Sequence, residues 1–222
     1  MRGKFILGDC MNPDYGLPSY PDKFFDLAIV DPPYGIGIAN DGLLHHNKQF
    51  EKGFRKNIDY GAKRWDSQKP KCDYFFELFR VSKNQIVWGF NFFTEHLPNS
   101  RNFIVWYKKG TDSNPNFSPC ELAWTSFSFV PKVYFYDWVG FGYINNGEKK
   151  IHPCHKPKRL YEKILEDYAK PGQLILDTHV GSASSLIACE SMGFDYVGFE
   201  IDPDYYAAAK NRMSKGIQAV LM

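Results

Sequence analysis

Short apolar runs alternate with helical patterns along this 222-residue chain, and this alternation restricts the fold more than any other feature. Runs of this length between turn residues are typical of buried strands, and longer periodic stretches are typical of helices. The alternation predicts an α/β fold with a mostly parallel sheet and helices on both faces. The expected strands are 4–7, 25–30, 85–88, 102–106, 121–125, 173–176 and 196–199, and the expected helices are 72–80, 158–170, 184–192 and 204–214.

The chain length and a hydrophobic content of 44% suit one domain over residues 1–222. The formal net charge is only +2, but lysine and arginine gather in residues 48–71 and 149–159. This distribution is typical of a protein that contacts nucleic acid with one face, although solvated lysine-rich loops explain the first stretch equally well.

Other signals are negative. The five cysteines are scattered without Cys-x-x-Cys spacing, and His152, Cys154 and His155 lack a fourth partner, so we expect neither a disulfide framework nor a metal. The first residues lack the apolar segment of a signal peptide, and no apolar run reaches the length that spans a membrane. We therefore expect a soluble cytoplasmic protein.

A polar, rigid and aromatic turn, Asp31-Pro32-Pro33-Tyr34, follows the apolar run 25–30 directly. The carboxyl ends of strands are where open α/β sheets bind ligands. Two prolines stiffen the turn and remove two backbone donors. The carboxylate and a proline carbonyl can accept the hydrogens of an exocyclic amine while the tyrosine stacks on the ring, which indicates a nucleobase. The alternative is an ordinary loop opener, because Asp-Pro-Pro also occurs in that role.

A second constellation lies in residues 174–202. The expected strand ends near Asp177, a turn of small residues around Gly181 and Ser182 opens a helix, and the next strand ends at Glu200. Such a turn lets a ligand approach the backbone, and a carboxylate about twenty residues later can bind ribose hydroxyls. Only one glycine remains in the turn, so a nucleoside is favoured over a pyrophosphate. A serine-capped helix without a ligand is the alternative.

At these residues the chain resembles the DNA amino-methyltransferases, which transfer a methyl group from S-adenosylmethionine to the exocyclic nitrogen of adenine or cytosine. Asp31-Pro32-Pro33-Tyr34 matches the family's catalytic tetrapeptide, and residues 177–184 are similar to its cofactor turn. Residues 152–157 resemble its His-Pro-x-x-Lys-Pro motif, and residues 8–10 resemble its N-terminal Gly-Asp element. The catalytic turn precedes the cofactor turn, which matches the circularly permuted subgroup called beta.

The resemblance implies a Rossmann-like methyltransferase fold and a role for each matching residue. Asp31, Pro32, Pro33 and Tyr34 form the catalytic turn that receives a flipped base. Adenine N6 is the expected target, because the cytosine enzymes more often carry serine at the position of Asp31. The expected cofactor contacts are Asp9 and Cys10 at the adenine edge, Glu200 at the ribose, Gly181 and Ser182 at the close backbone approach, Asp177 at the aminoacyl side, Lys156 at the aminoacyl carboxylate, and Ile201 beside Glu200. A surface lysine is the alternative for Lys156.

Departures from the family pattern leave other interpretations open. Thr178, His179 and Ala183 replace the usual Pro, Phe and Gly of the cofactor turn, and the Ala183 methyl is tolerated only if the backbone there does not need a positive φ. The expected target-recognition segment 127–151 is short, so sequence reading falls to the flexible basic loop 35–71, a partner subunit or weak specificity. Besides DNA, we expect a homodimer or a separate specificity or restriction partner as alternatives. A cytosine-N4 enzyme and a catalytically silent binding subunit are the rival functions.

Overall fold

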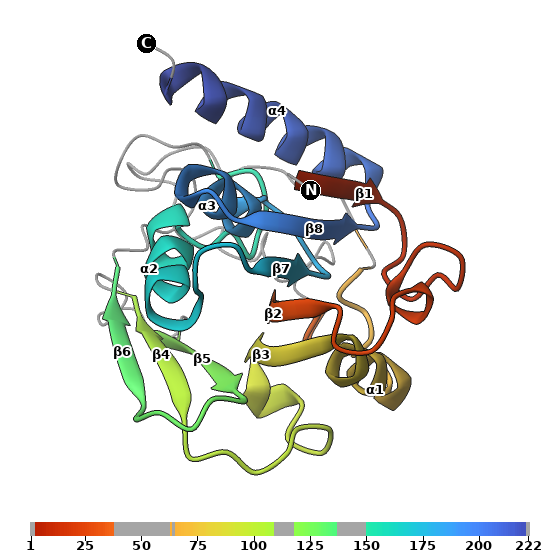
Figure 1. The fold of residues 1–222 in the computed structure, drawn as a ribbon, viewed down its shortest axis with the longest axis vertical. Coiled ribbons are helices and arrows are strands. Elements are labelled where there is room, and N and C mark those ends of the chain that lie inside the picture. Colours follow the sequence, from red (N-terminus) through yellow and green to blue (C-terminus); the bar gives the residue numbers. More distant parts are fainter. Residues whose placement is uncertain (1–2, 38–62, 64, 109–117, 137–149, 221–222) are drawn as a thin grey trace, which may run out of the picture.

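The computed structural model describes residues 3–37, 63, 65–108, 118–136 and 150–220, with side chains as far as residue 215. Eight strands form one sheet in these residues (Figure 1): β1 (Gly3–Leu7), β2 (Phe25–Val30), β3 (Ser82–Trp88), β4 (Phe103–Tyr107), β5 (Cys120–Thr125), β6 (Lys132–Phe135), β7 (Leu174–Asp177) and β8 (Asp195–Glu200). Their order across the sheet is β1-β8-β7-β2-β3-β5-β4-β6. The first five run parallel, β5 is antiparallel to both of its neighbours, and β6 is parallel to β4. The predicted mostly parallel sheet is confirmed.

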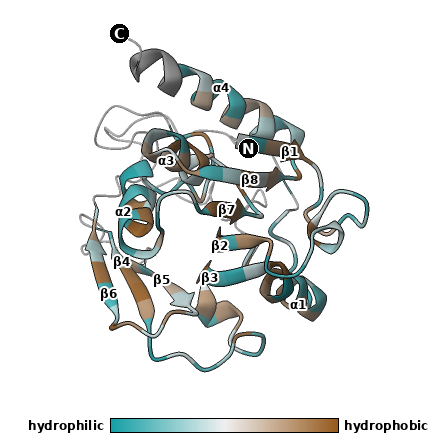
Figure 2. Ribbon diagram, in the orientation of Figure 1, coloured by the Kyte–Doolittle hydropathy of each residue, from teal (hydrophilic) through white to brown (hydrophobic). Residues whose placement is uncertain are grey.

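Helices cover both faces of the sheet, as predicted. α1 (Cys72–Val81) and the short 3₁₀ helix η1 (Leu17–Ser19) pack on one face, while α2 (Lys158–Tyr168) and α3 (Ser184–Met192) pack on the other. α4 (Pro203–Val220) adds Ala209 and Met213 to the core beneath α2 and α3. In β2, Leu27 and Ile29 belong to that core, whereas Ala28 belongs to the core beneath α1. Figure 2 shows polar and apolar residues together along α1, α2 and α4, as expected of helices with one buried face.

The boundaries differ from the sequence prediction in a few places. β6 lies inside segment 127–151, which we expected to be a target-recognition segment and did not list among the strands. Val133 pairs with Val105 of β4 at the edge of the sheet. A second 3₁₀ helix, η3 (Phe90–Phe92), follows β3, and α4 runs beyond the expected residue 214. Most of loop 35–71 and residues 137–149 lie outside the described residues. Among the described helices, none combines the length and the apolar character needed to cross a membrane.

The chain leaves β2 and β7 in opposite directions. α1 leads from β2 to β3 on one side, and α3 leads from β7 to β8 on the other, although β2 and β7 are neighbours. The boundary between them is therefore a topological switch point, where the carboxyl ends of strands open a crevice for ligands. Asp31 follows β2 and Asp177 ends β7 at this point.

Candidate active site

One cavity of about 350 Å³ opens over the carboxyl edge of the sheet. Residues from both sequence constellations line it, so the structure brings the two together. The predicted residues in its wall are Asp9, Cys10, Asp31, Pro32, Pro33, Tyr34, Lys156, Gly181, Ser182, Glu200 and Ile201. Asp177 is the only predicted site residue that is absent from the wall.

The catalytic turn is held by a hydrogen bond and by a ring stack. The Tyr34 hydroxyl donates to Asp31 Oδ1 over 2.7 Å. The Tyr34 ring stacks on Phe92 of η3, with ring centres 4.8 Å apart and planes 12° from parallel. Gly89 makes this packing feasible, because a Cβ at that position would lie 2.1 Å from Tyr34 Cε1. Burial raises the pKa of Asp31 although Lys156 acts in the opposite direction.

Lys156 is buried, which rules out the alternative of a surface lysine. It lies just before α2, and only 2% of its side chain is exposed. Its ammonium contacts Asp31 Oδ2 and lies 3.0 Å from Glu121 Oε2 of β5. Burial disfavours the charge on Lys156, but Asp31 and Glu121 together raise its pKa well above the usual value. The described contacts thus direct Lys156 to the catalytic turn, and its contact with a cofactor carboxylate stays a prediction.

Glu200 is presented to the cavity by backbone hydrogen bonds. Gly181 N–H donates to Oε2 over 2.8 Å, and Asp202 N–H donates to Oε1 over 2.9 Å. Each carboxylate oxygen has two lone pairs, so both keep an acceptor site after these bonds. Burial raises the pKa of Glu200 while the backbone donors counteract that effect. Gly181 has a φ of +53°, and a Cβ at this position would lie 3.4 Å from the ring of His152.

Asp177 points into the cofactor turn rather than into the cavity. Its carboxylate accepts the Ser185 hydroxyl and, over 3.0 Å, the N–H of His179. Burial raises the pKa of Asp177 to about 7. Asp177 therefore supports the cofactor turn through these two hydrogen bonds. Its contact with the aminoacyl side of the cofactor stays a prediction.

Ala183 departs from our expectation about the cofactor turn. We tied its tolerance to a backbone without positive φ, but Ala183 is left-handed with φ 62° and ψ 20°. It is also the N-cap of α3, so the serine cap that we considered is not formed there. Neighbouring bonds hold the conformation: Arg212 of α4 donates to the Ser182 carbonyl over 2.5 Å and to the Ser184 hydroxyl over 2.9 Å. Specific anchors of this kind let a non-glycine residue keep a strained conformation.

Three described residues of the predicted basic loop 35–71 lie at or near the cavity: Trp65 and Asp66 in its wall, and Lys63 beside the loop that follows Glu200. Lys63 lies 2.8 Å from Asp202 in the loop before α4, while Trp65 packs on His152 at 5.0 Å between ring centres. Asp66 Oδ1 accepts the N–H of Gly35 over 2.9 Å beside the catalytic turn. Lys63 and Asp66 thus contact the loop after Glu200 and the turn after β2, respectively. The sequence predicts a functional loop over residues 35–71 but not these individual contacts.

Three charged residues of the cavity wall were not predicted as site residues from the sequence: Lys108, Glu121 and Lys150. Glu121 Oε1 lies 2.6 Å from the Lys108 ammonium. Burial raises the pKa of Glu121, but Lys156 and Lys108 outweigh it and lower the pKa to about 2. Burial lowers the pKa of Lys150 to about 8. Across the described part of the chain, no group of three or more His, Cys, Asp or Glu side chains is arranged to hold a metal ion.

The sheet order, the switch point and the two turns that meet in one cavity define a Rossmann-like methyltransferase fold. The chain belongs to the DNA methylase family, whose model matches residues 25–211. The resemblance found in the sequence is thus confirmed at the level of the family. M.HpaI, a type II methyltransferase of Haemophilus parainfluenzae, is 24% identical over 240 residues, which cover 92% of this chain and 73% of that protein.

Two solved structures share the fold over nearly the whole chain. The complex of M1.HpyAVI with SAM has a TM-score of 0.60 and 18% identity, and the match covers 95% of this chain and 98% of that one. The cytosine-N4-specific DNA methyltransferase PvuII has a TM-score of 0.59 and 14% identity, with coverage of 100% and 93%. At these identities the likeness supports the fold alone.

Proposed function

We propose that this protein transfers a methyl group from S-adenosylmethionine to the exocyclic N6 of an adenine flipped out of DNA. The observation that carries the proposal is a cavity whose wall includes the turn at Asp31, the turn at Gly181 and Glu200. A donor of the methyl group and an acceptor amine must be held together in line, and the two turns of this cavity supply candidate residues for each.

The residues of the cofactor half fit a nucleoside with an aminoacyl tail. The Glu200 carboxylate keeps acceptor capacity for two ribose hydroxyls, and Gly181 lines the same cavity. Asp9 and Cys10 at the end of β1 are on the wall where the adenine edge is expected. S-adenosylmethionine supplies an electrophilic methyl group when it is bound.

The catalytic half provides acceptors and an aromatic ring. A flipped base costs a few kcal/mol, which stacking on an aromatic side chain partly offsets. Asp31 and the Pro32 carbonyl accept the two amine hydrogens, which favours the pyramidal nitrogen whose lone pair points at the methyl group. Alignment at about 3–3.5 Å supplies much of the acceleration. Asp31 need not be a strong base, because the methylated amine loses its proton readily.

Adenine is preferred over cytosine because Asp31 stands where the family's cytosine enzymes more often have serine. Cytosine N4 is the second candidate, since the similar fold of PvuII belongs to a cytosine-N4-specific enzyme. A catalytically silent subunit is less consistent with the intact pair of Asp31 and Tyr34, whose hydrogen bond is formed.

The test uses unmethylated DNA and labelled S-adenosylmethionine, followed by digestion to nucleosides and identification of the labelled species. We expect N6-methyladenine from the wild type and none from Asp31→Ala. N4-methylcytosine would replace the adenine assignment with the cytosine one. Cofactor binding without any incorporation would favour the silent subunit, and incorporation that persists in Asp31→Ala would refute the catalytic role of this turn.

A further inference from the structure

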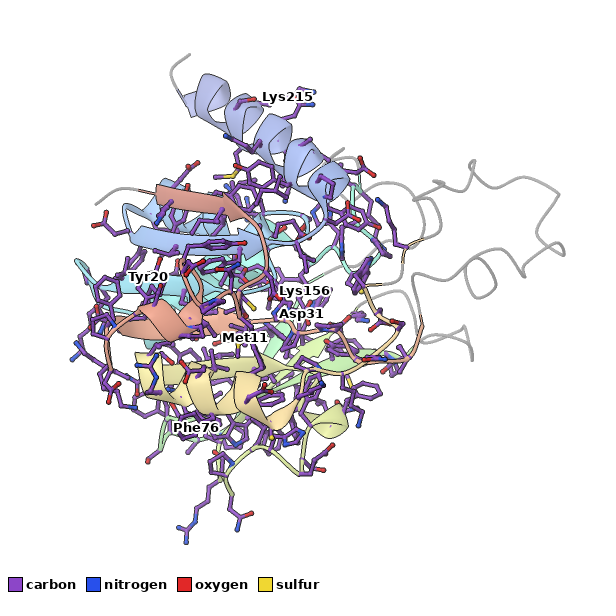
Figure 3. All side chains as sticks on the ribbon, turned by 90° about the vertical axis from the view of Figure 1, so that its right-hand side faces the viewer. Met11, Tyr20, Asp31, Phe76, Lys156 and Lys215 are labelled. Atoms are coloured by element: carbon purple, nitrogen blue, oxygen red, sulfur yellow. The ribbon has the colours of Figure 1, made fainter. Side chains whose placement is uncertain are left out.

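Four charged side chains of alternating sign extend away from the catalytic turn, from Asp31 through Lys156 and Glu121 to Lys108. They come from four segments: the turn after β2, the loop before α2, the start of β5 and the residue after β4. Two carboxylates thus face one buried ammonium. Figure 3 shows Lys156 and Asp31 beside each other near the centre of the molecule.

Lys156 is fixed through its backbone as well as its side chain. Its carbonyl accepts the hydroxyl of Ser184, the first residue of α3, over 2.6 Å. Its ammonium also lies 5.1 Å from the centre of the Trp88 ring. If the ammonium turned away toward a cofactor carboxylate, Asp31 would lose its cationic partner inside the protein. Breaking a buried ion pair in this way is strongly unfavourable.

We infer that Lys156 is a positioning residue that acts through Asp31, and that Glu121 holds the Lys156 ammonium in place. The inference rests on the proposed methyl transfer at Asp31. An ionised Asp31 has acceptor sites for both the Tyr34 hydroxyl and the target amine, whereas a protonated carboxyl would use one oxygen as a donor. Lys156 favours the ionised form and fixes its orientation, because the bond to Oδ2 complements the Tyr34 bond to Oδ1.

The surroundings of Asp31 contain groups of both signs, but Lys156 is the cation in direct contact with it. A neighbouring cation lowers the pKa of an aspartate by about 1–3 units, while Glu121 acts in the opposite direction. The other titratable groups that act on Asp31 or feel its charge are Tyr34, Tyr74, Cys154, Tyr161 and Asp177.

The test is the pH profile of the single-turnover methylation rate at saturating S-adenosylmethionine and DNA. As the pH is lowered, the rate of each variant should fall once Asp31 becomes protonated. We expect this fall to begin about 1–3 pH units higher in Lys156→Met than in the wild type, and the rate should then drop about tenfold for each further unit of decreasing pH. The double variant Lys156→Met/Glu121→Gln should shift back toward lower pH, because the like charge beside Asp31 is gone. The control Lys83→Met removes a lysine that pairs with Asp26 at the opposite edge of the sheet, and its profile should match the wild type.

Two results would overturn the inference. An unchanged profile with a raised KM for S-adenosylmethionine would assign Lys156 to the aminoacyl carboxylate. If the double variant has the same pH profile as Lys156→Met, the role of Glu121 is merely structural. If Lys156→Met fails to fold by circular dichroism, Lys156→Gln replaces it in the same comparison.

A second readout separates this inference from the proposed function. Carbon-13 NMR of the Asp31 carboxyl follows its titration without turnover, and the titration should move to higher pH in the Lys156 variant even if the wild type methylates nothing. An unmoved titration would refute the inference, whereas an inactive wild type would refute only the methyl transfer.

Discussion

Glu200→Gln offers a direct test of the cofactor half of the cavity. The wild-type carboxylate accepts Gly181 N–H at 2.8 Å on one oxygen and Asp202 N–H at 2.9 Å on the other. Glutamine replaces one of these oxygens with an NH₂ group, which cannot accept either bond. The side chain is buried, so the substitution leaves one backbone donor facing another donor.

The magnitude follows from the two roles of the carboxylate. A buried donor without a partner costs about 1–3 kcal/mol, and we expect that loss in the free energy of unfolding. If Glu200 binds the ribose as proposed, the substitution also removes one charge-assisted hydrogen bond to a ribose hydroxyl, which is worth about 1.5–3 kcal/mol. The dissociation constant of S-adenosylmethionine should therefore rise roughly 10- to 150-fold.

Isothermal titration calorimetry measures the dissociation constant, and urea denaturation of the same samples measures the stability. Glu166→Gln is the matched control, because Glu166 is an exposed residue of α2 that pairs only with Lys163 in the described contacts. If Glu200→Gln loses stability but binds S-adenosylmethionine as tightly as the wild type, Glu200 merely supports the turn and the ribose assignment is refuted.

Three other changes have defined outcomes. Gly89→Ala places a Cβ 2.1 Å from the Tyr34 ring at a φ of +68°, so single-turnover methylation should fall at least about tenfold while calorimetry shows unchanged cofactor binding. Ala183→Gly relieves a positive φ that costs about 1–2 kcal/mol, but it also removes a buried methyl group that stabilises by about 0.8 kcal/mol. These effects oppose each other, so the free energy of unfolding measured by urea denaturation should change by no more than about 1 kcal/mol, and a larger loss would contradict the strain at Ala183. The folded-state pKa of Glu121 is about 2, below the usual 4.5. Its ionised form therefore stabilises the fold fully above pH 4.5, and this stabilisation is lost as the pH falls toward 2. The corresponding pH dependence of the free energy of unfolding should be absent in Glu121→Gln.

The sequence predicts the two turns because each depends on a local pattern. An apolar run followed at once by a polar residue marks the carboxyl end of a buried strand, as at Val30 and Asp31. In a parallel sheet all such ends lie at one edge, so Asp31, Gly181 and Glu200 could be placed together without knowledge of the strand order. Their meeting in one cavity agrees with this reasoning.

Glu121 could not be placed in this way. It lies near the beginning of its strand, which in a parallel sheet would put it at the opposite edge. β5 is antiparallel and lies between β3 and β4, with Ala123 paired to Trp88, and this pairing brings its start to the carboxyl edge. Strand direction depends on contacts between distant segments, and a short apolar run carries no signal of it. The contact between Lys156 and Asp31 could not be predicted either, because the sequence indicates a lysine beside a helix but does not show that the lysine is buried.

The site also explains why the order of the two motifs along the chain can vary. β2 and β7 are adjacent although the chain enters one near its beginning and the other near its end, so the cavity depends on their pairing and not on which comes first. A further link between the two halves comes from a residue outside both turns. Lys156 provides it, because its ammonium contacts Asp31 while its carbonyl accepts the Ser184 hydroxyl. A change that shifts α3 should therefore be felt at Asp31 through the Lys156 backbone, even when neither turn is altered.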